Sequence, residues 1–178
     1  VEEEVVEEVF DNQPLLVWQG NAAGANLPRG RIFIGSCDAE ANVPALKAAN
    51  IAKVLMAARE LTPSSDGFEY CTVGLVDKPE ENLLQHFDEC FDFVDAAVTR
   101  GEGVLVHCYA GRSRSAAIVI AWLMRRGGIS LQAAWAQVSA VRPWIAPNEG
   151  FVRQLQHFEA VGCDVQKAVD SWDPAAAV

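Results

Sequence analysis

The most constraining stretch of the sequence is residues 104–126, where an apolar strand-like run and an almost entirely apolar helical run flank a short loop. Residues 104–106 read Val-Leu-Val, which is typical of a strand buried on both faces. The helical run at residues 115–126 is followed by two glycines, a common way for a helix to end. The apolar side chains of the strand and the helix must be buried by other strands and helices packed against them on several sides. This unit therefore predicts a layered α/β fold.

The rest of the chain repeats this alternation. Further β-rich runs are expected at residues 15–19, 31–34, 53–57 and 70–76, and helical patterns at residues 44–49, 80–100, 130–141 and 148–160. This order predicts a central, mainly parallel sheet of about five strands flanked by helices. The loop after residue 106 then lies at the carboxyl ends of the strands, where open α/β sheets bind ligands.

Length and composition indicate one ordinary globular domain. The chain has 178 residues, of which 51% are hydrophobic and 21% are charged. We expect an acidic and flexible lead-in at residues 1–14, the domain at residues 15–162, and a C-terminal tail at residues 163–178.

Charge and cysteine content exclude several classes of function. The net charge is −10, which disfavours nucleic acid and anionic membranes as partners. We find neither an apolar run that could span a membrane nor a signal peptide, so we expect a cytoplasmic location, with a nuclear one also open. The five cysteines are odd in number and form no CxxC pair, which argues against a disulfide framework or a zinc site. No metal and no cofactor is expected.

The loop between the strand and the helix has the composition of an anion site. Cys108 and Arg114 are separated by five residues, so the loop can curl with its backbone N–H groups inward and the guanidinium across from them. A planar arginine fork matches two oxygens of a phosphate. The same positive field favours the thiolate form of the cysteine, which is the nucleophilic form.

Residues 107–115 read His-Cys-Tyr-Ala-Gly-Arg-Ser-Arg-Ser, which resembles the signature of the cysteine-dependent dual-specificity protein phosphatases. The resemblance extends over roughly residues 30–160. Residues 32–36 look like an N-terminal strand and turn of that family, residues 74–77 like its general-acid loop, and residues 147–151 like a C-terminal helix junction.

The resemblance implies a cysteine-dependent phosphatase fold and a role for each matched residue. Cys108 would attack phosphorus and become a phosphocysteine, Asp77 would act as general acid and base, and Ser115 would help the sulfur to leave. His107 and Asn148 would support the site. Phosphate would be bound by the loop amides and by Arg114, that is, by the segment Tyr109, Ala110, Gly111, Arg112, Ser113 and Arg114.

Several alternatives stay open. Asp66 and Asp88 are other carboxylates near Asp77 in the sequence, and Arg112 either extends the phosphate-binding field or points to solvent. We expect a phosphoprotein substrate, with a protein kinase as one candidate, and a monomer by default. The alternatives are a phosphatase for a non-protein phosphate, such as an inositol lipid or a glucan, and a phosphate-recognition module without turnover.

Overall fold

The computed structural model describes residues 11–20 and 29–175. Its centre is a five-stranded sheet with the order β1-β2-β5-β3-β4. The strands are β1 (Leu15–Gln19), β2 (Arg31–Gly35), β3 (Ile51–Ala57), β4 (Glu69–Val73) and β5 (Gly103–His107). Only the edge strand β1 runs antiparallel to its neighbour, and the other pairs are parallel. The expected mainly parallel sheet is confirmed.

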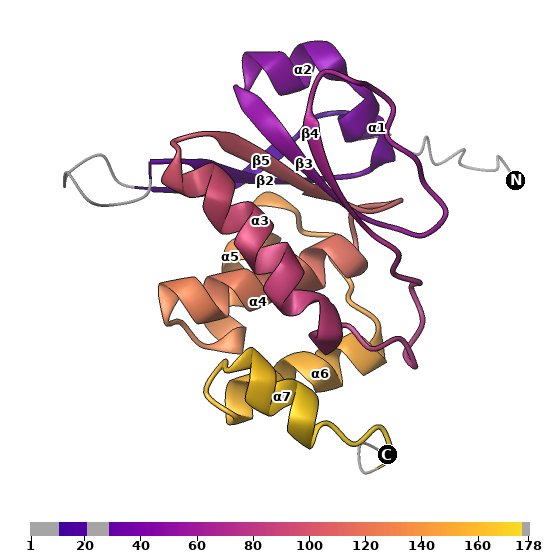
Figure 1. Cartoon of the computed structure of the whole chain (residues 1–178), viewed down its shortest axis with the longest axis vertical. Coiled ribbons are helices and arrows are strands. Elements are labelled where there is room, and N and C mark those ends of the chain that lie inside the picture. The colour runs from indigo at the N-terminus through magenta and orange to yellow at the C-terminus, as the bar shows by residue number, and fades with distance from the viewer. Residues whose placement is uncertain (1–10, 21–28, 176–178) are drawn as a thin grey trace, which may run out of the picture.

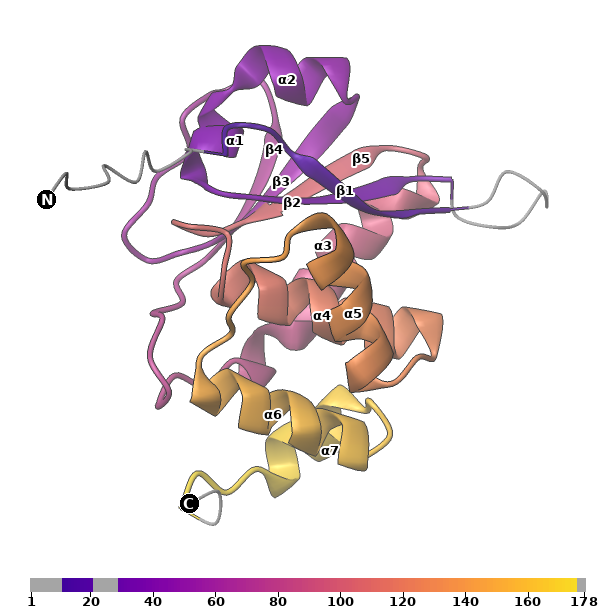
Figure 2. The same ribbon diagram turned by 180° about the vertical axis from the view of Figure 1, so that it is seen from behind.

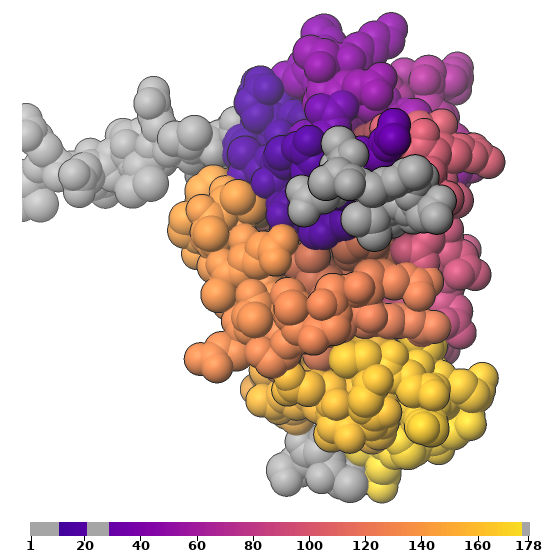
Figure 3. Space-filling model, turned by 90° about the vertical axis from the view of Figure 1, so that its left-hand side faces the viewer, coloured from indigo at the N-terminus to yellow at the C-terminus, as the bar shows by residue number. Residues whose placement is uncertain are grey.

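Helices cover both faces of the sheet (Figure 1). The helical elements are α1 (Cys37–Ala41), α2 (Val43–Ala48), the 3₁₀ turn η1 (Leu84–His86), α3 (Phe87–Thr99), α4 (Arg114–Gly127), α5 (Leu131–Val141), α6 (Glu149–Ala160) and α7 (Val165–Ser171). Helices α1 and α2 lie on one face, and α3, α4 and α5 lie on the other. Seen from the side, α6 and α7 form a further layer below α4 and α5 (Figure 3).

The strand β5, the helix α4 and the loop between them form the centre of the molecule. Strand β5 is buried along its whole length between β2 and β3, and every residue of α4 from Arg114 to Met124 is buried. Gly128 ends α4 in the left-handed conformation, with φ of 61°. The loop that joins β5 to α4 therefore connects a fully buried strand to a helix that is buried along most of its length.

Aromatic side chains close the core on the helical face. The ring centroid of Phe87 lies 5.1 Å from that of Phe91 and 5.0 Å from that of Phe158, which joins α3 to α6. On the opposite side of the molecule, α5 packs beside β1 (Figure 2). There Trp18 meets Trp122 edge to face, with ring centroids 5.1 Å apart, so the antiparallel edge strand is tied to the helical layer.

Several elements differ from the sequence-based expectation, and the short helix α1 was not expected at all. The helix expected at residues 80–100 begins as the 3₁₀ turn η1 at Leu84 and continues as α3 only from Phe87. Just before it, the amides of Leu83 and Leu84 donate to the buried side chain of Gln154, at 2.7 and 3.3 Å. Strand β4 ends at Val73, and the amide of Leu75 then turns back to the Val73 carbonyl at 2.8 Å. The segment expected as a tail contains α7, which buries Val165 and Ala168. No helix in the described part of the chain is long and apolar enough to span a membrane.

Candidate active site

The candidate site is the phosphate loop, residues 108–114, at the carboxyl edge of the sheet. Its first residues run beside the end of β2, where the amide of Cys37 donates to the Tyr109 carbonyl at 2.9 Å. Its last residue begins α4. Because β5 is the central strand, the ends of β2 and β3 border the loop on both sides.

The nucleophile candidate lies at the bottom of this loop. Cys108 is 2% exposed, and its Sγ lies 3.3 Å from the Oγ of Ser115, which is fully buried on the first turn of α4. The two side chains that the sequence paired as nucleophile and leaving-group helper are therefore in contact. A hydroxyl at this position can donate a hydrogen bond to sulfur as negative charge develops on it.

Arg114 crosses the loop from the start of α4. Its guanidinium forms a two-pronged ion pair with Glu60, with nitrogen–oxygen distances of 2.7 and 2.8 Å, and donates to the Leu75 carbonyl at 3.2 Å. Its Nε is buried and has no hydrogen-bond partner in the described structure. A buried guanidinium nitrogen without a partner is rare, so this edge of Arg114 is available to an anion.

Glu60 is a site residue that the sequence analysis missed. The hydrogen bond from Arg114 holds the pKa of the Glu60 carboxyl below its usual value, so the pair stays ionised. The signal that could have revealed it is its position, because Glu60 follows closely after β3, at the same edge of the sheet as Cys108. Carboxylates at the ends of neighbouring parallel strands are candidates for contact with that loop.

Asp77 lies beside the second half of the loop. Its Oδ1 accepts hydrogen bonds from the hydroxyl of Ser113 at 2.6 Å and from Nδ2 of Asn148 at 2.9 Å. The Ser113 hydroxyl also accepts a hydrogen bond from the backbone N–H of Asn148 at 3.0 Å. Two segments that are far from Asp77 in the sequence thus hold its carboxylate beside the phosphate loop.

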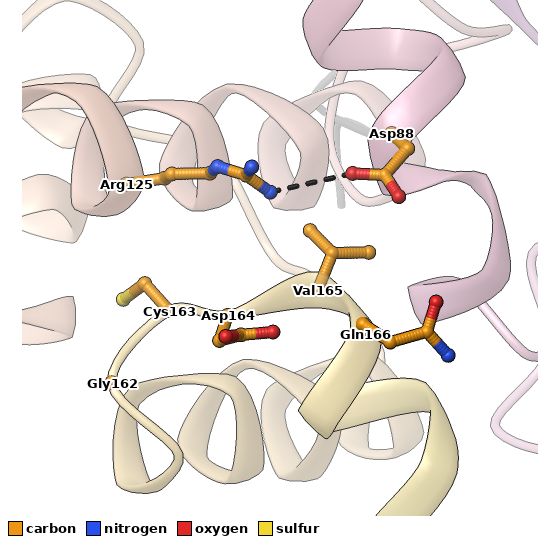
Figure 4. A pocket seen from close by; sticks show the side chains of 7 residues that line it. All are labelled: Asp88, Arg125, Gly162, Cys163, Asp164, Val165 and Gln166. Atoms are coloured by element: carbon orange, nitrogen blue, oxygen red, sulfur yellow. Dashed lines mark hydrogen bonds and ion pairs between the residues drawn. The ribbon is translucent and has the colours of Figure 1, made fainter.

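The competing carboxylates lie elsewhere. Asp66 is an exposed turn residue. Asp88, on α3, pairs with Arg125 of α4 at 3.3 Å in a polar pocket on the helical side, which also holds Cys163 and Asp164 (Figure 4). Of the three carboxylates considered from the sequence, only Asp77 contacts a residue of the phosphate loop.

Arg142 shapes the first half of the loop and was also missed. Its side chain is 1% exposed and follows α5. It donates from Nε to the Gly111 carbonyl at 2.6 Å, from Nη2 to the Ala110 carbonyl at 3.0 Å, and from Nη1 to the carboxylate of Asp11. By drawing two loop carbonyls outward, this guanidinium favours the orientation in which the neighbouring N–H groups face inward.

Gly111 is required in that arrangement. It has a positive φ of 62°, and a Cβ there would lie 2.7 Å from Nη2 of Arg142 and closer still to the Gly35 carbonyl.

The Asp11 carboxylate, which pairs with Arg142, comes from the segment that the sequence analysis assigned to the acidic lead-in. Nothing in the sequence pattern distinguishes Asp11 from the other acidic residues near it.

His107, for which the resemblance implies a supporting role, directly precedes Cys108 at the end of β5. Its ring is fully buried, and Nδ1 lies 3.3 Å from the Cys108 carbonyl. Burial lowers the pKa of His107 below its usual value, which favours the neutral ring. The ring therefore contacts the backbone of Cys108 and is not open to solvent.

The remaining loop residues are exposed to different degrees. Tyr109 and Arg112 are exposed, whereas Ser113 is 4% exposed. The described residues contain no group of three or more histidine, cysteine, aspartate or glutamate side chains that could hold a metal ion. The positive groups present in the loop are its amides and arginines, and both kinds suit a phosphate.

Comparison with known proteins places this geometry in a class. The sequence profile described as "Dual specificity phosphatase, catalytic domain" matches residues 32–161. "Dual specificity protein phosphatase 1" of Arabidopsis thaliana is 43% identical over 150 residues, which cover 84% of this chain and 70% of the relative. "Dual specificity protein phosphatase 1B" of the same plant is 44% identical over 129 residues, or 72% of this chain and 77% of the relative.

Solved structures agree with the sequence relatives. The crystal structure of human DUSP28 has a TM-score of 0.73 and 33% identity, covering 85% of this chain and 96% of that one. The human "tyrosine phosphatase-like serine/threonine/tyrosine-interacting protein" also has a TM-score of 0.73, with 30% identity over 86% of this chain and 99% of that one. The chain belongs to the dual specificity phosphatase family, within the cysteine-dependent tyrosine phosphatases. It is a protein tyrosine/serine/threonine phosphatase.

Proposed function

We propose that this chain hydrolyses phosphotyrosine and phosphoserine or phosphothreonine in proteins, through a phosphocysteine at Cys108. The observation that carries the proposal is the meeting of three groups at one loop. A buried cysteine in contact with Ser115, an arginine with an unpartnered Nε and a carboxylate that accepts from Ser113 all lie at the phosphate loop. These are the nucleophile, the anion clamp and the proton donor that phosphoryl transfer needs.

In the first step, the Cys108 thiolate attacks phosphorus and forms a sulfur–phosphorus bond while the phosphorus–oxygen bond to the substrate breaks. Asp77, in its protonated form, gives its proton to the leaving oxygen. Arg114 and the loop amides stabilise the charge on the three remaining phosphoryl oxygens. The second oxygen of Asp77 serves best as the proton donor, because Oδ1 already accepts two hydrogen bonds.

In the second step, water attacks the phosphocysteine, and the Asp77 carboxylate takes one proton from that water. The sulfur–phosphorus bond breaks, inorganic phosphate leaves, and the Cys108 thiolate is restored. The hydroxyl of Ser115, 3.3 Å from the sulfur, stabilises the thiolate as it leaves. Each step transfers one phosphoryl group, and Asp77 returns to its protonated form.

The test compares the wild type with Cys108→Ser on an aryl phosphate and on phosphotyrosine and phosphothreonine peptides. We expect the variant to lose about a thousandfold or more of kcat/KM on every substrate. Acid quenching during turnover should trap phosphate on the peptide that contains Cys108. Cys163→Ser, at the distant pocket, is the matched control and should keep both the turnover and the adduct. Full turnover by Cys108→Ser would overturn the proposal.

The substrate class is tested in parallel. Equal concentrations of phosphopeptides, inositol phosphates and phosphoglucans are offered to the wild type, and we expect the phosphopeptides to be turned over fastest. The loop lacks lysine between Cys108 and Arg114, which supports phosphoprotein over inositol lipid. Faster turnover of either non-protein substrate would refute this part of the proposal.

A second candidate is phosphate recognition without turnover. It is favoured by one observation, since a relative with 30% identity and the same fold is named an interacting protein. This candidate predicts that the wild type binds phosphopeptides but releases no phosphate. The enzymatic proposal is the better supported of the two, because Cys108 contacts Ser115, Arg114 is held by Glu60, and Asp77 is held by Ser113.

A further inference from the structure

A groove of about 900 Å³ runs from the phosphate loop along the Asp11 side of the molecule. Its lining comes from residues 11–13, from the end of β2 and the start of α1, from the first half of the phosphate loop, and from the segment after α5. Tyr109, Ala110 and Arg112 belong both to the loop and to the groove. A peptide whose phosphate enters the loop can therefore place its neighbouring residues in the groove.

The arginines at this site differ in whether their charge is already neutralised. Arg114 is paired with Glu60, and Arg142 is paired with Asp11. Arg112 has no carboxylate within ion-pair distance in the described part of the chain. Among the described residues of a chain with a net charge of −10, it is a cation without a carboxylate partner in the groove beside the phosphate loop.

Arg112 is also held in place. Its carbonyl accepts from the Ala146 amide at 2.8 Å, and its Nε donates to the Trp144 carbonyl at 3.2 Å. The two terminal nitrogens of the guanidinium have no hydrogen-bond partner among the described residues. An arginine whose stem is fixed while its terminal nitrogens stay open loses little freedom when it binds an anion.

Two exposed aromatic rings belong to the same groove. Tyr109 is 58% exposed and Trp144 is 45% exposed. The Trp144 ring is backed by the Arg142 guanidinium, whose central carbon lies 4.8 Å from the ring centroid. An exposed aromatic ring that is held from behind, as that of Trp144 is, offers contact area to a peptide chain at low entropic cost.

We propose that Arg112 is a specificity-determining residue that selects phosphopeptides with a second anionic group close to the phosphoresidue. That group is a carboxylate or a second phosphate, both of which match the open edge of a guanidinium. Lysine or arginine at the same substrate position would be repelled. The proposal rests on the proposed function, because it concerns what lies next to the phosphate that the loop binds.

The first experiment measures kcat/KM for phosphotyrosine peptides in which glutamate, phosphothreonine, alanine or lysine occupies each of the three positions on either side of the phosphotyrosine. For the wild type, we expect glutamate or phosphothreonine to exceed alanine by about three- to tenfold at one or two positions, the size of one partly exposed charge-assisted contact. The glutamate and phosphothreonine arms show which anion is preferred.

Variants then assign the preference to one side chain. In Arg112→Ala, the ratio of the glutamate to the alanine peptide should fall to about one, and in Arg112→Glu the lysine peptide should become the better substrate. Arg59→Ala is the matched control. Arg59 is an exposed arginine next to Glu60, and its side chain does not line the groove. This substitution should leave the ratio unchanged.

The second experiment measures binding of the same peptides to Cys108→Ser and to Cys108→Ser/Arg112→Ala, so that the selectivity is tested whether or not the chain turns peptides over. A glutamate preference that is lost with Arg112 supports the proposal in either assay. A wild type that hydrolyses all peptides at equal rates and binds them equally would overturn it and leave the phosphatase activity intact. A preference that persists in Arg112→Ala would also overturn it.

Discussion

Residues 109–111 form the first half of the phosphate loop, and residues 113–115 form its second half together with the start of α4, yet the two halves are held by different kinds of contact. The carbonyls of the first half are drawn to the buried guanidinium of Arg142. In the second half the side chains themselves are engaged, Ser113 with Asp77, Arg114 with Glu60, and Ser115 with Cys108. These contacts suggest that the first half sets the shape of the anion-binding loop, whereas the second half holds the groups proposed to transfer a proton and to stabilise charge. Substitutions around the two halves should differ in what they change.

The largest effect is expected for Asp77→Ala, beside the second half. Turnover of a phosphoserine peptide should fall by about 10²–10⁴-fold, because its leaving oxygen needs a proton. A nitrophenyl phosphate has a better leaving group and should lose much less. The kcat/KM values of both substrates provide the measurement. Asp66→Ala and Asp88→Ala are the controls, and a loss below about tenfold on the phosphoserine peptide would contradict the assignment.

The next effect is expected for Arg142→Lys, at the first half. A lysine offers one point charge and cannot reach two carbonyls and the Asp11 carboxylate in the same geometry. We expect kcat/KM and inhibition by inorganic phosphate to weaken together by about ten- to a hundredfold, whatever the leaving group, as expected for a misplaced set of anion-binding groups.

The leaving group is what separates the two halves in this comparison. Arg125→Lys, which alters an exposed ion pair at the distant pocket, is the control and should leave phosphate inhibition unchanged. If Arg142→Lys gave the leaving-group dependence of Asp77→Ala, the division between shape and chemistry would be wrong.

A smaller effect is expected for Asn148→Ser. Asn148 both donates to Asp77 and caps α6, through its Oδ1, which accepts from the Phe151 amide at 2.9 Å. Serine is an equally good helix cap but cannot reach Asp77 in the same way, so thermal stability should change little. Turnover of the phosphoserine peptide should fall by about three- to tenfold, the size of one charge-assisted hydrogen bond. A loss that appears in the melting temperature alone would show that Asn148 acts only as a cap.

The smallest effect is expected for Glu60→Gln, measured as melting temperature against pH. The pKa of Glu60 is lowered in the folded protein by the hydrogen bond from Arg114, so the pair stabilises the fold at pH values above the usual carboxyl pKa. The stabilisation is lost as the pH falls below that value and through the lowered one. The wild type should therefore melt above Glu60→Gln at neutral pH, and the difference should shrink under acidic conditions. A difference that is independent of pH would show that the charge of Glu60 does not matter.

Much of the site could be predicted because several of its residues lie in one continuous segment of the sequence. The order of strand, loop and helix at residues 103–127 brings Cys108, Arg114 and Ser115 together through local geometry. Asp77 and Asn148 are distant in sequence and were predicted from the resemblance to a family, not from spacing. The structure adds that they contact each other and Ser113. Their roles in catalysis stay predictions until the variants are measured.

The features that were missed depend on long-range contacts. Glu60 is separated from Arg114 by 54 positions and Asp11 from Arg142 by 131, so no local pattern connects the partners. The start of α3 was placed too early because the apolar spacing continues through residues 83 and 84, whose amides are bound by Gln154, 70 or more positions away. The helix α7 was missed in a segment whose few apolar residues need the layer of α6 to be buried.

The sequence by itself determined the layered α/β class, the central strand and helix, and the loop between them, because alternating periodicity and a run of buried residues act over short distances. The tertiary structure alone decided which charges are neutralised. Glu60 and Asp11 pair with Arg114 and Arg142, while Arg112 has no carboxylate partner in the part of the chain that the structure describes. Charge pairing depends on which loops meet at the edge of the sheet, and only the folded chain brings those loops together.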